Sequence, residues 1–213
     1  NSLDANTTGA NNTAVGYQAL GANTTASENV AIGKGSLDAC TTGAENTAVG
    51  TDSLGSLTTG ERNVAVGRQA LYALTTAEKN TGIGFEALEA LTEGDENTAV
   101  GYRTLKAITT GYNNTCIGKE AAQNATTAGG NASCGHNTLN NLTTGGSNSA
   151  LGNTALGEVT TGSNNFGIGN DAGRSNAPGG AIITSDNQGC LGNNNITYIG
   201  AKVSISVTSD KRD

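Results

Sequence analysis

Few residues of this 213-residue chain are suited to chemistry, and their spacing favours no reaction. The one histidine, His136, excludes a His-rich metal site and argues against a hydrolytic triad. The carboxylates are scattered, whereas glycoside hydrolysis requires two of them held across a cleft. They include Glu28, Glu45, Glu86, Asp95, Glu96 and Glu120. No Gly-Gly-x-Gly-x-Asp calcium-binding run occurs. We therefore expect no enzyme, no metal site and no cofactor.

The four cysteines, Cys40, Cys116, Cys134 and Cys190, form no CxxC or Cys/His metal spacing. The first three occupy apolar positions of the repeat described below, so each is expected to act as a small hydrophobic residue. Cys116 and Cys134 fall in neighbouring repeats but on opposite faces of a strand, which argues against a disulfide between them.

The composition limits the partners of the chain. Its net charge is −7 and its pI about 4.6, which disfavours nucleic acid, because phosphates require basic patches. No run approaches the 18 apolar residues of a membrane span, so no membrane insertion is expected.

An asparagine followed by a short apolar stretch and glycine, as in Asn12-Thr13-Ala14-Val15-Gly16, returns every 17 residues without a slip. Fixed-period self-similarity indicates one small unit stacked on itself. We number the positions of the unit from its asparagine. The stacked asparagines should form a structural ladder of hydrogen-bonded amides. Its members are Asn12, Asn29, Asn46, Asn63, Asn80, Asn97, Asn114, Asn131, Asn148 and Asn165.

Seventeen residues are too few for two helices, and the glycines at position 5 and near position 15 interrupt any helical period. Two short strands with tight turns fit instead, because positions 2 to 4 alternate and use β-branched residues. The sequence therefore predicts an all-β parallel β-solenoid or β-roll of 17-residue coils. We expect the aliphatic residues at positions 4 and 9 to fill its interior. Position 3, Ala or Gly, should then point outward and form a close contact between chains, which favours a closed cyclic oligomer.

The period also divides the chain. Residues 1–180 are interpreted as a solenoid of ten repeats, with a partial coil over 1–11. In the tenth repeat Pro178, which lacks the amide that a sheet ladder needs, is expected to end the stacking. Residues 181–209 are interpreted as a non-repetitive C-terminal β cap, and residues 210–213 as the start of a chaperone domain or a polar tail.

At Asn29-Val30-Ala31-Ile32-Gly33 and Asn63-Val64-Ala65-Val66-Gly67 the repeat resembles the head repeats of the YadA-like trimeric autotransporter adhesins. This resemblance implies a left-handed parallel β-roll packed as a homotrimer. The unit here is longer than the usual adhesin repeat, and longer units are similar to repeats in tail fibres and spikes of bacteriophages and some large viruses.

The C-terminal residues Thr208-Ser209-Asp210-Lys211-Arg212-Asp213 resemble the entry to a peptidase S74-type intramolecular chaperone domain. That resemblance implies Ser209 as the serine of self-cleavage and Ser209–Asp210 as the bond that is cut. Cleavage would need the chaperone body, which lies beyond Asp213, so none is expected from this chain alone. The alternative is that residues 209–213 are a polar tail.

Three surface columns are candidate binding sites, of which the charged edge at positions 16 and 17 (Glu61-Arg62, Glu78-Lys79 and Asp95-Glu96) is interpreted as a solvated rim. Position 6 carries Tyr17, Phe85 and Tyr102, of which the last two fall one coil apart and could contact sugar rings; the alternative is isolated surface aromatics. Positions 13 and 14 are mostly a Thr pair. A flat Thr array could bind ice, but adjacent Thr side chains point to opposite faces, so a hydrogen-bonded turn ladder is the better interpretation.

These observations predict a structural or adhesive segment of a viral or phage tail fibre or spike, located in the virion or at a cell surface. It would form a rigid trimeric shaft that binds a host glycan or protein. The alternatives are the head of a bacterial trimeric autotransporter adhesin and an ice-binding β-solenoid.

Overall fold

A computed structural model describes residues 1–177, 179–193 and 195. Each coil contributes one three-residue strand, and the described residues contain no helix. The strands are β1 (Thr13–Val15), β2 (Val30–Ile32), β3 (Thr47–Val49), β4 (Val64–Val66), β5 (Thr81–Ile83), β6 (Thr98–Val100), β7 (Thr115–Ile117), β8 (Ala132–Cys134), β9 (Ser149–Leu151), β10 (Phe166–Ile168) and β11 (Gly189–Leu191).

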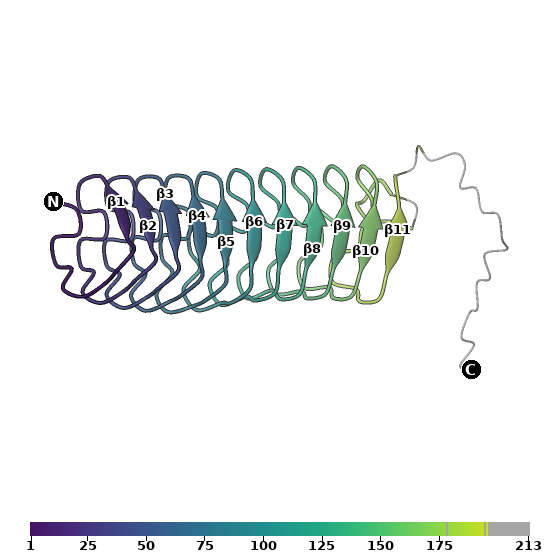
Figure 1. The fold of residues 1–213 in the computed structure, drawn as a ribbon. Coiled ribbons are helices and arrows are strands. Elements are labelled where there is room, and N and C mark those ends of the chain that lie inside the picture. The colour runs from purple at the N-terminus through teal and green to yellow at the C-terminus, as the bar shows by residue number, and fades with distance from the viewer. Residues whose placement is uncertain (178, 194, 196–213) are drawn as a thin grey trace, which may run out of the picture.

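The strands form one 11-stranded parallel sheet in chain order, and the coils stack into a rod with β1 and β11 at opposite ends (Figure 1). Equivalent positions pair directly: Ala31 lies beside Ala14 in one neighbouring strand and beside Ala48 in the other. The predicted parallel β-solenoid with a 17-residue coil is confirmed. Ten inter-strand steps of ~4.8 Å make the stack ~48 Å long.

The predicted second strand of each coil is absent among the described residues, and turns take its place. At positions 7 and 9 the backbone is left-handed, as at Gln69 (φ 57°) and Leu71 (φ 53°), which no extended strand allows. The coils still bond to one another there, since the amide of Leu71 donates to the carbonyl of Ala87 at 2.9 Å. The buried position 9 leucines pack in a continuous stack, so burial offsets the cost of their conformation.

The prediction that position 4 points inward and position 3 outward is wrong. Ala31, Ala48 and Ala65 at position 3 are fully buried, whereas the aliphatic residue that follows each of them is partly or fully exposed. The physical reason is space, because a 17-residue coil is thin and already holds the leucines of positions 9 and 12. Only an alanine-sized side chain fits beside them: a Cβ added at Gly82, in position 3, would lie 3.2 Å from Leu71 Cγ.

Position 5 must be glycine for two reasons. Gly33 has φ 137°, and a Cβ placed on it would lie 2.5 Å from the carbonyl oxygen of Gly50 in the next coil. A side chain there would be strained and would push the coils apart.

The sequence predicted that stacking ends at Pro178, but in the structure it continues beyond this residue. β11 pairs in register with β10, although it follows 23 residues later instead of 17. The six extra residues form an excursion closed by the amide of Ile182, which donates to the carbonyl of Gly173 at 2.8 Å. Ile182 then returns to the core. The described part of the predicted cap over 181–209 is therefore one more coil, and most of the remainder lies outside the described residues.

Candidate functional site

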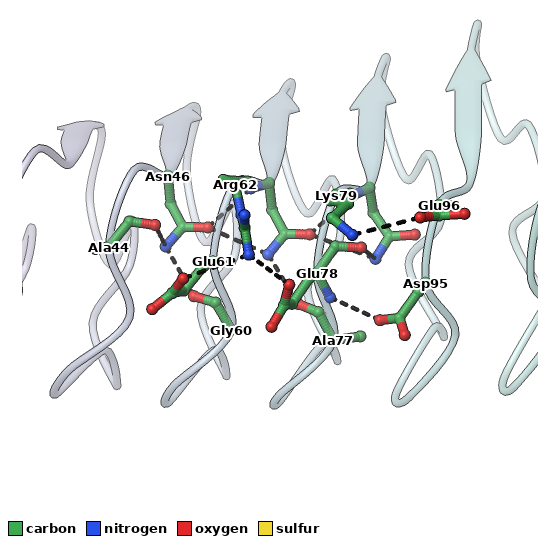
Figure 2. A network of polar contacts seen from close by, with 12 residues as sticks. Ala44, Asn46, Gly60, Glu61, Arg62, Ala77, Glu78, Lys79, Asp95 and Glu96 are labelled. Atoms are coloured by element: carbon green, nitrogen blue, oxygen red, sulfur yellow. Dashed lines mark hydrogen bonds and ion pairs between the residues drawn. The ribbon is translucent and has the colours of Figure 1, made fainter.

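The asparagine ladder runs along the starts of the strands (Figure 2). Asn97 shows its bonding: its backbone amide donates to Oδ1 of Asn80 at 2.9 Å, and its Nδ2 donates to the carbonyl of Gly111 at 2.9 Å. Its own Oδ1 accepts from the backbone amide of Asn114 at 3.1 Å. Asn97 thus bonds to the asparagines of the coils before and after its own. The ladder predicted from the sequence is present, and its members from Asn29 to Asn165 are buried.

The threonines form a second ladder. The hydroxyl of each position 13 Thr donates to the carbonyl of the equivalent residue in the next coil, as from Thr58 to Thr75 at 3.0 Å. The position 14 threonines, such as Thr59, are exposed. The position 13 threonines are thus used in hydrogen bonds between coils, and only the position 14 threonines face solvent. This agrees with the interpretation of the Thr pairs as a hydrogen-bonded turn ladder.

The largest feature that the sequence did not predict is an apolar column along the outside of the sheet. We call the residues of positions 2 and 4 the outer face. Its position 4 members are Val15, Ile32, Val49, Val66, Ile83, Val100, Ile117, Cys134, Leu151, Ile168 and Leu191. Val15 is 58 % exposed and Leu151 53 % exposed, so aliphatic surface faces solvent along the whole stack. Alternation correctly separated position 4 from position 3, but the predicted direction of the two sets was wrong, because it depends on the volume of the interior, which the local pattern does not show.

The outer face is hollowed near its C-terminal end. A cavity of about 370 Å³ opens where position 2 carries the small residues Ala132 and Ser149 and position 4 carries Cys134. Ile117, Leu151 and Phe166 are among the larger side chains that line it. Beneath it, the buried hydroxyl of Ser133 has no hydrogen-bond partner.

The position 6 aromatics form a stack rather than an open platform. The rings of Phe85 and Tyr102 lie 5.5 Å apart with an interplanar angle of 10°. Arg68 lies over the Phe85 ring at 5.4 Å and Lys119 over the Tyr102 ring at 6.0 Å. The rings therefore cover one another, and cations flank the outer faces of the pair. Tyr17, four coils before Phe85, is 63 % exposed and takes no part in this stack.

A charged cluster adjoins the stack. Glu86 accepts from Arg103 Nε at 2.8 Å and from Lys106 Nζ at 2.6 Å. Burial alone would raise the pKa of Glu86, but the hydrogen bonds from Lys106 and Arg103, with their charges, outweigh it and hold the pKa below its ordinary value. The carboxylate is therefore ionised at neutral pH, which suits a structural ion pair better than a proton donor.

The remaining candidates for chemistry lie apart. His136 contacts Asn153, whose Nδ2 is 3.2 Å from the His136 Nδ1. Burial raises the pKa of the Cys40 thiol to about 11 and that of Cys116 to about 12, so both are unreactive. In the described ranges no three His, Cys, Asp or Glu side chains gather in a way that would hold a metal ion. Ser209 and Asp210 lie outside the described residues.

Within the part of the chain that the structure describes, no helix is long and apolar enough to span a bilayer. Comparison of the chain with models of protein families, with curated protein sequences and with solved structures gave no match.

Proposed function

We propose that the chain is a shaft segment of a viral or phage tail fibre or spike that assembles as a homotrimer through the outer face. The observation that carries this proposal is the continuous column of exposed Val, Ile and Leu at position 4. Contiguous apolar surface on a soluble protein marks an interaction site. The column repeats with every coil, so its partner must be an equally long and regular object, and another copy of the rod meets that requirement.

The internal bonding supports the mechanical part of the proposal. Asparagine and threonine ladders link each coil to the next along the rod, in addition to the backbone bonds of the sheet. Bending the rod would stretch these bonds in many coils at once. A trimer closed around an axis along the rod would bury the outer face of all three copies and leave the opposite surfaces exposed.

We further propose that an exposed surface binds a host glycan or protein, with Tyr17, Phe85 and Tyr102 as candidate contacts. Phe85 and Tyr102 offer their ring edges, because each covers a face of the other, whereas Tyr17 is more exposed. A glycan array with wild-type protein and a Tyr17→Ala, Tyr102→Ala variant tests this part. Equal array signals from both proteins would contradict it.

The head of a bacterial trimeric autotransporter adhesin is the alternative with the same assembly. Ice binding is favoured by one observation: Thr81, Thr98 and Thr115 lie side by side at position 2, next to the aliphatic column. An ice-binding face must be open to solvent, so this function and burial of the outer face exclude each other.

Light scattering on a gel-filtration column separates the two trimeric proposals from ice binding by a single chain. Three times 21.1 kDa supports the trimeric fibre or adhesin. A 21.1 kDa particle contradicts it, and thermal hysteresis of that monomer would then support ice binding. The proposed cut at Ser209–Asp210 is tested separately, by mass spectrometry of a chain joined to an S74-type chaperone domain.

A further inference from the structure

One coil of the rod lacks a side chain where the coils on both sides have one. At position 10, Gly157 lies between Asn140 of the coil before it and Arg174 of the coil after it. A Cβ added at Gly157 would have backbone atoms as its three nearest neighbours, the closest being the carbonyl oxygen of Thr154 at 2.9 Å. No side chain from a neighbouring coil is among them, so the space over this glycine is left open.

Two other position 10 glycines show that such a gap is usually filled. A Cβ added at Gly21 would lie 2.5 Å from Oδ1 of Asp38 in the next coil. One added at Gly55 would lie 3.2 Å from the ring of Tyr72, also in the next coil. At Gly157 the residue of the next coil, Arg174, is held elsewhere by ion pairs.

The gap is part of a polar hollow of about 200 Å³. We call it the Gly157 hollow; its lining residues are Asn137, Asn140, Asn141, Thr154, Gly157 and Arg174. None of them belongs to the outer face, so the proposed assembly does not use them. Sites for drug-sized ligands have about 300–1,000 Å³, so this volume suits a single small ring.

The guanidinium of Arg174 is fixed in place at one end of the hollow. Its Nη1 lies 3.0 Å from Oδ1 of Asp171, and its Nε lies 3.3 Å from Oε1 of Glu158. The hydrogen bond from Thr154 outweighs burial and, with that from Arg174, holds the pKa of Asp171 below its ordinary value. Asp171 is therefore ionised at neutral pH. The Nη2 group of Arg174 makes no hydrogen bond to the described residues, so its N–H donors are available.

The asparagines at the other end are also ordered by hydrogen bonds. Nδ2 of Asn140 donates to the carbonyl of Glu120 at 3.0 Å and to Oδ1 of Asn137 at 3.3 Å. Nδ2 of Asn137 and the whole carboxamide of Asn141 make no hydrogen bond within the described part of the chain. The hollow thus offers N–H donors at both ends and, on Asn141, an acceptor as well.

We infer that the Gly157 hollow binds one neutral sugar residue of a host glycan. This inference rests on the proposed host binding and gives it a site apart from the aromatic residues. Each sugar hydroxyl both donates and accepts, and so matches side chains that offer amide and guanidinium N–H groups together with an amide oxygen. A ring seated over Gly157 would lie between Asn140 and Arg174, two coils or ~9.6 Å apart along the stack.

The charges around the hollow favour a neutral ligand. Arg174 carries one positive charge, and Asp171 and Glu158 carry two negative charges, a net charge of −1. Glu120 lies 3.7 Å from Lys119, so this pair adds no net charge. An anionic sugar would meet an excess of carboxylates, which opposes its binding. The proposed trimer would carry three hollows, so weak single sites could act together on a surface covered with glycans.

Saturation-transfer NMR titrations test the inference. The probes are the methyl glycosides of glucose, galactose, mannose and N-acetylglucosamine, with sialic acid as the anionic comparison. Wild type should bind at least one neutral glycoside and not sialic acid. Asn141→Ala should raise the dissociation constant about 2- to 10-fold, because it removes one exposed hydrogen-bonding group and leaves the fold intact. Arg174→Lys keeps the charge but loses the planar fork, so it should weaken binding too. Asn6→Ala, an exposed asparagine of the first partial coil, is the matched control and should bind like wild type.

The outcomes separate this site from the proposed function. If wild type binds no neutral glycoside, or binds sialic acid alone, the inference is wrong. Wild-type affinity in both Asn141→Ala and Arg174→Lys would also overturn it. If binding falls in the Tyr17→Ala, Tyr102→Ala variant but not in Asn141→Ala, glycans bind at the aromatic residues and the Gly157 hollow has no part. A trimer that binds no sugar would overturn the inference and leave the proposed shaft in place.

Discussion

Ala31 and Ile32 are neighbours in β2, yet Ala31 is fully buried and Ile32 is 40 % exposed. The pair shows which way the sheet faces: the small residue fills the thin interior and the large aliphatic residue remains outside. The same relationship repeats along the rod. Because the position 4 side chain points outward in every coil, these side chains together form an exposed apolar surface along the whole stack.

This relationship predicts opposite effects for the same substitution at adjacent residues. Ala31→Asp buries an unpaired carboxylate in the apolar core to which Leu20 and Leu37 belong, and should abolish the cooperative thermal transition, or lower the free energy of unfolding by about 3 kcal/mol or more. Ile32→Asp should leave the circular dichroism spectrum of the coil unchanged and lower the mass of the assembly. If Ile32→Asp unfolds the chain and Ala31→Asp does not, the assignment of the two faces is wrong.

The asparagine ladder should be sensitive at its centre. Asn97→Ala leaves the amide of Asn114 and the carbonyl of Gly111 buried without their partners, at about 1–3 kcal/mol for each group. We expect the free energy of unfolding to fall by about 2–5 kcal/mol in a urea titration. Asn141→Ala is the matched control, because Asn141 is exposed, and it should change stability by less than about 0.5 kcal/mol. Equal effects of the two changes would refute a structural role for the ladder.

Ser133 is a site where substitution should stabilise the protein. Its hydroxyl is buried without a hydrogen-bond partner, and most coils carry alanine at the same position. Ser133→Ala removes the unsatisfied group, so we expect a gain of about 1 kcal/mol and a higher melting temperature. Ser149→Ala, on the exposed outer face, should have little effect on the single chain. A loss of stability in Ser133→Ala would mean that the hydroxyl has a partner in solution.

The Glu86 cluster predicts a specific dependence on pH. The folded-state pKa of Glu86 is lowered, so its contribution is present above the ordinary carboxyl pKa of 4.5 and is lost as the pH falls through the folded pKa. Glu86→Gln should therefore be less stable than wild type at pH 7, and the difference should shrink below pH 4.5. Comparing urea midpoints of the two proteins at each pH removes the contribution of other carboxylates. A difference that is constant with pH would show that Glu86 acts through packing alone.

The cysteines report on the outer face. Cys134 is exposed in the single chain, whereas Cys40 and Cys116 are buried with raised pKa values. In the proposed assembly Cys134 lies on the buried face, so maleimide should label it slowly in wild type and rapidly in Ile32→Asp. Cys40 and Cys116 should react only after denaturation in both proteins. Rapid labelling of Cys134 in an intact wild-type trimer would show that the trimer forms through another surface.

The sequence by itself determined the repeat, the parallel solenoid and the asparagine ladder. A strict 17-residue period requires that equivalent residues stack, so a buried asparagine on every coil finds hydrogen-bond partners in the asparagines above and below it. The pattern of positions 2 to 4 also determined that one set of side chains faces in and the other out, but alternation alone is symmetric between the two choices.

Only the tertiary structure decided which set of side chains faces the interior, because the direction depends on how much volume the rest of the coil already occupies. Leu20 and Leu37 at position 9 come from a segment whose left-handed backbone the sequence did not reveal, and they leave room for Ala31 and not for Ile32. The tertiary structure also showed that stacking continues past residue 180. A 23-residue spacing breaks the sequence period, but Ile182 returns to the core and β11 still pairs with β10.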